Sequence, residues 1–170
     1  HWRRRRRQDR LAARTARQRL VVELGDAACE GTDAQRAYLS RVYRQLNHSR
    51  FGGRLPRELP IRLSRRMRRR FGHVKYGYGP QHRRVVHEIA LNLDLMLAGN
   101  ERHLFDTMLH EMAHVEAWLD HGDGGHGVAW REIAERVDCE ARACSWSRIR
   151  TRGRRDAEVT RVPRMVDLAS

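Results

Sequence analysis

The chain has 170 residues, of which 35 are Lys or Arg and 21 are Asp or Glu, so its formal net charge is +14 at pH 7. Hydrophobic residues make up 40% of the sequence, which is enough for one core and excludes a fully disordered polymer. No apolar run reaches the roughly 18–20 residues of a membrane span, and residues 1–7 lack the apolar segment of a secretory signal. We therefore expect a cytoplasmic protein without a membrane partner, nucleoid-associated if it is bacterial.

Residues 1–31 are predicted to form a basic, flexible arm. Residues 1–24 contain nine Arg against Asp9 and Glu23, and five of these Arg form the run Arg3–Arg7. A solvated arm is a better interpretation than an organelle-targeting peptide, although such peptides are also rich in Arg. Because the first residue is His rather than Met, we expect a trimmed fragment of a longer chain.

The first predicted helix starts directly after the arm. Thr32 and Gln35 have the spacing of a capping box, in which two side chains satisfy backbone N–H groups at the start of a helix. Apolar residues then recur at helical spacing up to residues 47–49, where we expect the helix to end. These residues are Leu39, Val42, Tyr43 and Leu46.

Three short strands are predicted next, at Ile61–Leu63, Phe71–Tyr76 and Val85–Asn92. We expect them to form a small antiparallel sheet. In this sheet Ile89–Asn92 is a candidate edge strand for pairing with an extended substrate.

A second basic cluster, Arg65–Arg70, lies between the first two strands. Such a cluster suits a polyanion, because each neutralised phosphate releases a counterion. We therefore predict contact with DNA through Arg3–Arg7 and Arg65–Arg70. The alternative is compositional, since 34 of the 35 cationic residues are Arg and a GC-rich coding sequence also produces that bias.

A long apolar helix from Glu101 to about Asp120 is predicted at the centre of the core, with Asn100 as its N-cap. A Gly-rich loop follows, and a last helix is expected at Val128–Val137. The predicted domain, residues 32–140, is therefore α+β. Residues 141–170 are expected to form a basic, mostly irregular tail.

The long helix contains the sequence His110-Glu111-Met112-Ala113-His114, which matches H-E-x-x-H. Residues four apart lie one above the other on a helix, so His110 and His114 can bind one zinc ion. Glu111 lies beside that position, where it can take a proton from water and pass it to a leaving amine. The motif also arises by chance in a chain with 10 His, but a capped apolar helix followed by a Gly-rich turn favours a metal site.

Three residues are candidates for a third zinc ligand. His126 is favoured, because it follows Gly124 and Gly125 and small residues let the backbone approach the metal-binding helix. His121 and Glu132 are the alternatives. Three His ligands would leave the fourth position of one catalytic Zn²⁺ open to water.

These motifs together resemble the SprT-like (Spartan-type) zinc metalloproteases. The resemblance covers about residues 33–138 and rests on the segments 43–47, 51–56, 89–92, 109–114 and 126–130. It implies a zincin-like fold, His110, His114 and His126 as zinc ligands, and Glu111 as the catalytic acid and base. It also implies hydrolysis of proteins that are associated with or crosslinked to DNA.

The chain departs from many relatives, which carry a cysteine-paired zinc ribbon after the catalytic part. Only Cys139 and Cys144 follow it here, and together with Cys29 they do not form a disulfide framework. Two rival functions stay open: a non-catalytic nucleic-acid-binding module with a structural zinc, and a general cytosolic peptidase without a DNA link.

Several aromatic residues are further candidates for the site. Trp118 and Trp130 are expected to pack in the core, with a part in a substrate cleft as the alternative. Tyr76, Tyr78 and His73 are candidates for stabilising an oxyanion, and plain packing or exposure is the simpler interpretation of each.

Overall fold

The computed structural model describes residues 31–139, 148–153 and 159–164. The predicted arm with Arg3–Arg7, the residues Cys29 and Cys144, and much of the predicted tail lie outside them. Within the described residues, no helix is both long enough and apolar enough to cross a membrane.

The helices and strands follow the predicted order. They are α2 (Asp33–Phe51), β1 (Ile61–Ser64), β2 (Gly72–Tyr78), β3 (Arg84–Asn92), α3 (Glu101–His121) and α4 (Val128–Arg136), with 3-10 turns at Pro80–His82 and Leu93–Met96. The described residues therefore form an α+β fold with a small three-stranded sheet.

The start of α2 is the predicted capping box. The backbone N–H of Gln35 donates to Thr32 Oγ1 over 3.1 Å, and the N–H of Thr32 donates to Gln35 Oε1 over 3.0 Å. The helix continues to Phe51, slightly further than predicted, and ends at Gly52, whose φ of 60° suits glycine. The predicted apolar stripe of α2 is buried.

The sheet is mixed rather than antiparallel, so this part of the prediction was wrong. Its order is β1-β3-β2, with β3 antiparallel to β2 and parallel to β1. The short β2–β3 hairpin forces antiparallel pairing, and β3, whose residues Ile89–Asn92 are all buried, takes the centre. Ile89–Asn92 is hydrogen-bonded on both sides and cannot be an edge. Within the described residues, the two edge strands are β1 and β2, and β2 is the one against which α3 packs.

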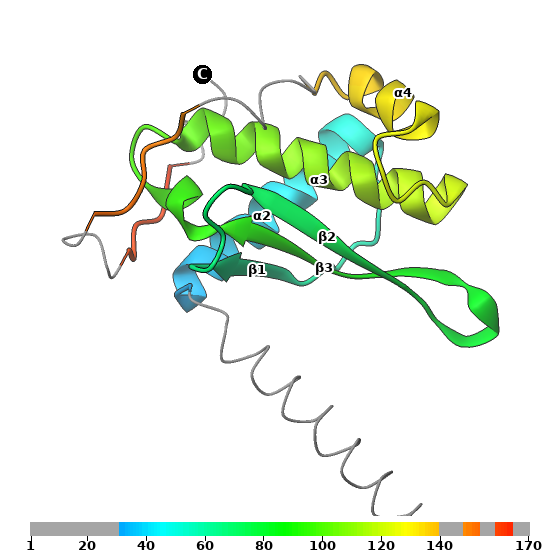
Figure 1. Ribbon diagram of the computed structural model, residues 1–170, viewed down its shortest axis with the longest axis horizontal. Helices are drawn as coiled ribbons and strands as arrows, with labels where there is room; N and C mark the ends of the chain where they lie inside the picture. The colour runs from blue at the N-terminus through cyan, green and yellow to red at the C-terminus, as the bar shows by residue number, and fades with distance from the viewer. Residues whose placement is uncertain (1–30, 140–147, 154–158, 165–170) are drawn as a thin grey trace, which may run out of the picture. The chain divides into compact units, whose positions relative to one another are not determined.

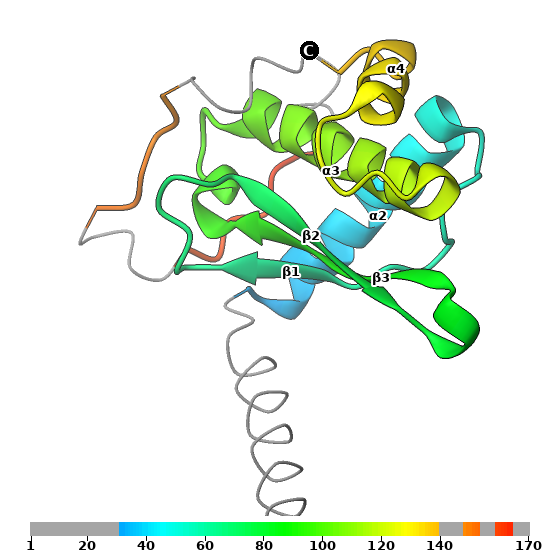
Figure 2. The ribbon, with the colours of Figure 1, turned by 45° about the vertical axis from the view of Figure 1, so that its right-hand side comes forward.

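One face of the sheet is apolar and carries the core. It is formed by Ile61, Leu63, Val74, Ile89 and Leu91. Helix α3 packs against β2 and β3, and α2 packs against β1 (Figures 1 and 2). The central helix α3, which contains the H-E-x-x-H sequence, is thus packed directly against the edge strand β2.

The opposite face is polar, with an ion pair between Arg62 and Glu88 at 3.2 Å and with His73 on the same side. The β2–β3 hairpin extends beyond the short strand β1 (Figures 1 and 2), and it is attached to the end of α3 through Arg84, whose Nε donates to Leu119 O. In β2, alternate residues counted from Gly72 and Val74 lie on the same side of the strand and face α3.

Asn100 precedes α3 as predicted, but its side chain does not cap the helix. Its Nδ2 donates to the carbonyls of Asp94 and Arg150, and its Oδ1 accepts from Arg150 N. The amide is used to bind the segment 148–153 to the domain, and Arg152 forms an ion pair with Asp94 nearby. The described parts of the predicted tail contain no helix or strand.

Candidate metal and catalytic site

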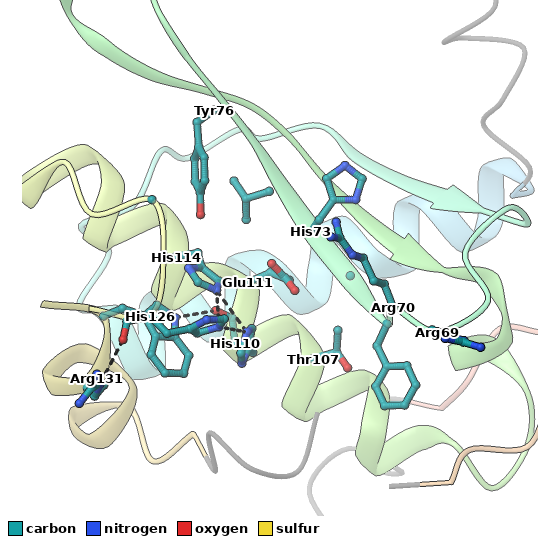
Figure 3. Close-up of a pocket in the computed structure, with 16 residues that line it drawn as sticks. Arg69, Arg70, His73, Tyr76, Thr107, His110, Glu111, His114, His126 and Arg131 are labelled. Atoms are coloured by element: carbon teal, nitrogen blue, oxygen red, sulfur yellow. Dashed lines mark hydrogen bonds between the residues drawn. The ribbon is translucent and has the colours of Figure 1, made fainter. Parts of the chain in front are cut away.

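The structure brings His110, His114 and His126 together. Helix α3 places His110 and His114 one turn apart, and the loop before α4 returns His126 to them (Figure 3). The three Nε2 atoms form a triangle with separations of 3.2 Å (His110–His114), 3.1 Å (His114–His126) and 3.1 Å (His110–His126). Among the described residues, this is the group that offers a metal ion three ligand atoms.

The geometry of these nitrogens fits a tetrahedral zinc ion. Ligands about 2.0–2.1 Å from zinc at tetrahedral angles lie about 3.3–3.4 Å from one another, close to the observed separations. The three Nε2 atoms cannot all be hydrogen-bonded to one another, because a ring nitrogen either donates or accepts and does not do both. The buried Nδ1 atoms of His110 and His114 have no partner within the described residues, which fits Nδ1–H tautomers with Nε2 lone pairs facing the centre.

The electrostatics also favour neutral imidazoles. Burial, with repulsion from His126, lowers the pKa of His110 to about 4. Burial, with repulsion from His110 and His126, lowers the pKa of His114 to about 3. Both rings are therefore unprotonated at pH 7, which is the form that ligates metals.

Glu111 lies beside this cluster and is 5% exposed. Burial raises the pKa of its carboxyl to about 8, and the positive charge of Arg70 opposes the shift. Gly72 of β2 covers Glu111 so closely that a Cβ there would lie 2.9 Å from Glu111 Oε1. A side chain at residue 72 would displace the Glu111 carboxyl, so the strand passes over Glu111 undisturbed because residue 72 is Gly, a requirement that the sequence did not reveal.

A cleft of about 730 Å³ opens over the cluster. Its lining includes all three His and Glu111, joined by Tyr76 and His73 of β2, Arg69 and Arg70 of the preceding loop, and Trp130 and Arg131 of α4 (Figure 3). Trp130 is buried and also lies against the site, with its ring 4.4–5.2 Å from the three imidazole rings. Trp118 instead packs against Tyr76 and Tyr78.

The other ligand candidates lie elsewhere. His121 is exposed at the end of α3, and Glu132 is exposed on α4; neither lines the cleft. Cys139 is buried in the core, with its Sγ 4.0 Å from the carbonyl of Asp106, and is not part of the histidine group.

The comparison with protein families decides the membership of the chain. The sequence model of the SprT-like family matches residues 39–151, more than half of the chain. The chain belongs to the SprT-like family. It is also similar to the germ cell nuclear acidic protein of Drosophila melanogaster, with 30% identity over 97 residues. That match covers 57% of this chain and only 9% of the relative. No solved structure matches this SprT-like chain significantly.

Asp123 organises the loop that carries His126, a part that the sequence analysis missed. Its Oδ1 accepts from Gly125 N at 2.9 Å, and its Oδ2 accepts from Trp130 N at 3.2 Å, in the first turn of α4. These backbone N–H groups hold the pKa of Asp123 below its usual value. The Asp followed by two Gly is typical of a turn in which the side chain binds the backbone two residues on. That local signal was present in the sequence.

Replacing Asp123 by Ala is expected to weaken zinc binding by about 10–100-fold, because the loop would no longer hold His126 against α3. Competition with a chromophoric chelator measures the affinity. Asp120→Ala, at an exposed residue in the last turn of α3, is the matched control and should leave the affinity unchanged. Equal zinc affinity in both variants would mean that Asp123 does not position the third His.

Proposed function

We propose that this SprT-like domain is a zinc-dependent endopeptidase that hydrolyses proteins associated with or crosslinked to DNA. The proposal is supported above all by one observation: three Nε2 atoms at ligand spacing lie in an open cleft beside a buried carboxyl, that of Glu111. A zincin-like arrangement, with the metal helix α3 under the edge strand β2, is part of the proposal.

In the proposed reaction, His110, His114 and His126 hold one Zn²⁺, which when bound supplies Lewis acidity for activating water and a peptide carbonyl. Glu111 takes a proton from the attacking water and later delivers it to the nitrogen of the leaving amine. A nearby cation would favour the ionised carboxylate and bring its high pKa down toward the working pH. Burial of Glu111 keeps bulk water from exchanging that proton.

The proposed substrate lies along β2. This strand borders the cleft, and within the described residues no strand pairs with its outer edge. An extended peptide can add to such an edge through main-chain hydrogen bonds. This supports an endopeptidase that acts on extended segments, because a peptide can form these main-chain hydrogen bonds only in an extended conformation.

The DNA part of the proposal is supported by the position of the run Arg65–Arg70. All five Arg of the run are exposed, and Arg69 and Arg70 reach the rim of the cleft. Phosphates bound there would bring a DNA-attached protein to the site. Arg3–Arg7 is a further proposed contact that lies outside the described residues. A nucleoid or other cytoplasmic location would provide such substrates.

The test combines metal content with cleavage. The purified chain should contain one zinc per molecule and should cleave a protein crosslinked to a DNA duplex. Replacing the five Arg of the run by Gln should weaken DNA binding and reduce the salt dependence of binding, while zinc content stays the same. Absence of cleavage by the zinc-loaded chain would contradict the peptidase.

The same measurements separate the rival functions. A general peptidase would cleave free and crosslinked protein equally, and the Arg substitutions would change both rates to the same extent. A nucleic-acid-binding module with structural zinc would bind DNA and zinc without cleavage. The open cleft over the three imidazoles favours the peptidase over this module, since structural zinc sites are closed by four protein ligands.

A further inference from the structure

The cleft contains one phenol that the mechanism above does not use, Tyr76 of β2. Of the three oxyanion candidates in the sequence, Tyr76 and His73 line the cleft, whereas Tyr78 does not and is 64% exposed. The pairing register places His73 on the polar face of the sheet, near Arg62 and Glu88. Tyr76 comes two residues after Val74, so it lies on the same side of β2 as Gly72 and Val74 and faces α3.

The orientation of Tyr76 is fixed by its surroundings. Its ring packs against Trp118 with the centroids 5.1 Å apart, and Trp118 Nε1 donates to Val85 O in the neighbouring strand over 3.0 Å. The hairpin register shifts between Lys75 and Tyr76, where β3 has one extra residue. Bulges of this kind recur next to active sites, where they aim a side chain. The phenol oxygen points toward the three imidazoles and Glu111 (Figure 3).

We propose that Tyr76 is a catalytic residue of the same site, donating a hydrogen bond from its phenol to the oxyanion that forms when a peptide bond is hydrolysed. This rests on the proposed peptidase function. When Glu111 takes the proton of water, the hydroxide adds to the carbonyl carbon and the C=O π pair moves onto the carbonyl oxygen. The Tyr76 O–H donates to that oxygen and keeps its own proton. The C=O bond then re-forms, the C–N bond breaks, and the proton on Glu111 goes to the amine.

The environment keeps Tyr76 in the donor form. Burial, together with the negative charges of Glu111 and Asp123, raises the pKa of the phenol well above its ordinary value. A neutral phenol in a half-buried cleft donates without the cost of reorganising solvent, which makes such donors effective. The ring also forms part of the cleft wall on the β2 side, the side on which a substrate strand would lie.

Tyr76→Phe is the decisive variant, because it removes the hydroxyl and keeps the ring against Trp118. For cleavage of a fluorescein-labelled protein crosslinked to a DNA duplex, we expect kcat to fall about 100–1,000-fold with KM and zinc content unchanged. Tyr78→Phe is the matched control, two residues further along the same strand, and should stay within about twofold of wild type. Thermal unfolding of both variants monitors folding.

A second readout does not depend on turnover. A phosphinic peptide carries a tetrahedral anionic group in place of the scissile amide, so it reports binding of the oxyanion. Its affinity, measured by calorimetry, should fall at least tenfold in Tyr76→Phe and stay unchanged in Tyr78→Phe. Wild-type kcat and wild-type phosphinate affinity in Tyr76→Phe would overturn the role of Tyr76. A wild-type chain that cleaves nothing would overturn the peptidase function instead, and equal phosphinate affinity would then still decide against Tyr76.

Discussion

Replacing Glu111 by Gln is expected to reduce peptide hydrolysis by about 100- to 10,000-fold while zinc stays bound. Gln fills the same space under Gly72 but cannot accept a proton from water, and positioned general bases contribute rate factors of this size. None of the three ligand nitrogens is changed, so the metal content should equal that of wild type. Cleavage of the DNA-crosslinked protein, with zinc measured by atomic emission, is the experiment.

Glu132→Gln is the matched control for this substitution. Glu132 is an exposed glutamate of α4 outside the cleft, so the same chemical change there should leave both activity and zinc content intact. Undiminished hydrolysis by Glu111→Gln would mean that Glu111 does not act as the general acid and base. Loss of zinc in Glu111→Gln would instead mean that the carboxyl supports the ligands rather than the chemistry.

The same substitution is expected to stabilise the metal-free protein at high pH. The carboxyl of Glu111 has a pKa near 8 when folded, against 4.5 for an unburied glutamate. As pH rises above about 5, the unfolded chain loses this proton while the folded chain keeps it. Stability therefore falls between about pH 5 and 8 and is constant above that. An amide side chain does not titrate, so Glu111→Gln avoids this loss.

The expected difference in stability is small at pH 5 and grows to about 5 kcal/mol at pH 9, since the pKa values of 8 and 4.5 differ by 3.5 units and one unit corresponds to about 1.4 kcal/mol. Thermal unfolding in the presence of a chelator, from pH 5 to 9, measures it. The titrations of His110 and His114 are common to both proteins and cancel in the comparison. A difference that does not vary with pH would contradict the raised pKa of Glu111, and Glu132→Gln should show no difference at any pH.

Much of the local structure follows from short stretches of sequence. The capping box at Thr32 and Gln35, the apolar stripe of α2 and the length of α3 depend on residues three or four apart, and each is present in the structure. The spacing of His110 and His114 likewise sets their distance once the segment is helical. These features needed no knowledge of distant contacts.

The sheet shows where local patterns are insufficient. The three strands were located to within a few residues. Their order in the sheet, however, depends on which strand pairs with both of the others. The alternation of residues 61–64 does not reveal that β1 pairs with β3 rather than with β2, the next strand in the sequence. The strand edge that borders the cleft is therefore β2 rather than Ile89–Asn92. The proposed place for a substrate is along β2. Asn100 similarly binds Arg150, 50 residues away, instead of its own helix.

The sequence by itself determined the membership in the SprT-like family and the candidates for the metal and the proton, because these depend on residue type and on spacing within one helix or one turn. Only the tertiary structure decided that His126 rather than His121 or Glu132 meets the pair on α3, and that Gly72 and Tyr76 border Glu111. Those relations join side chains of different elements, so they arise from how α3, the loop before α4 and the edge strand pack, and no single segment encodes them.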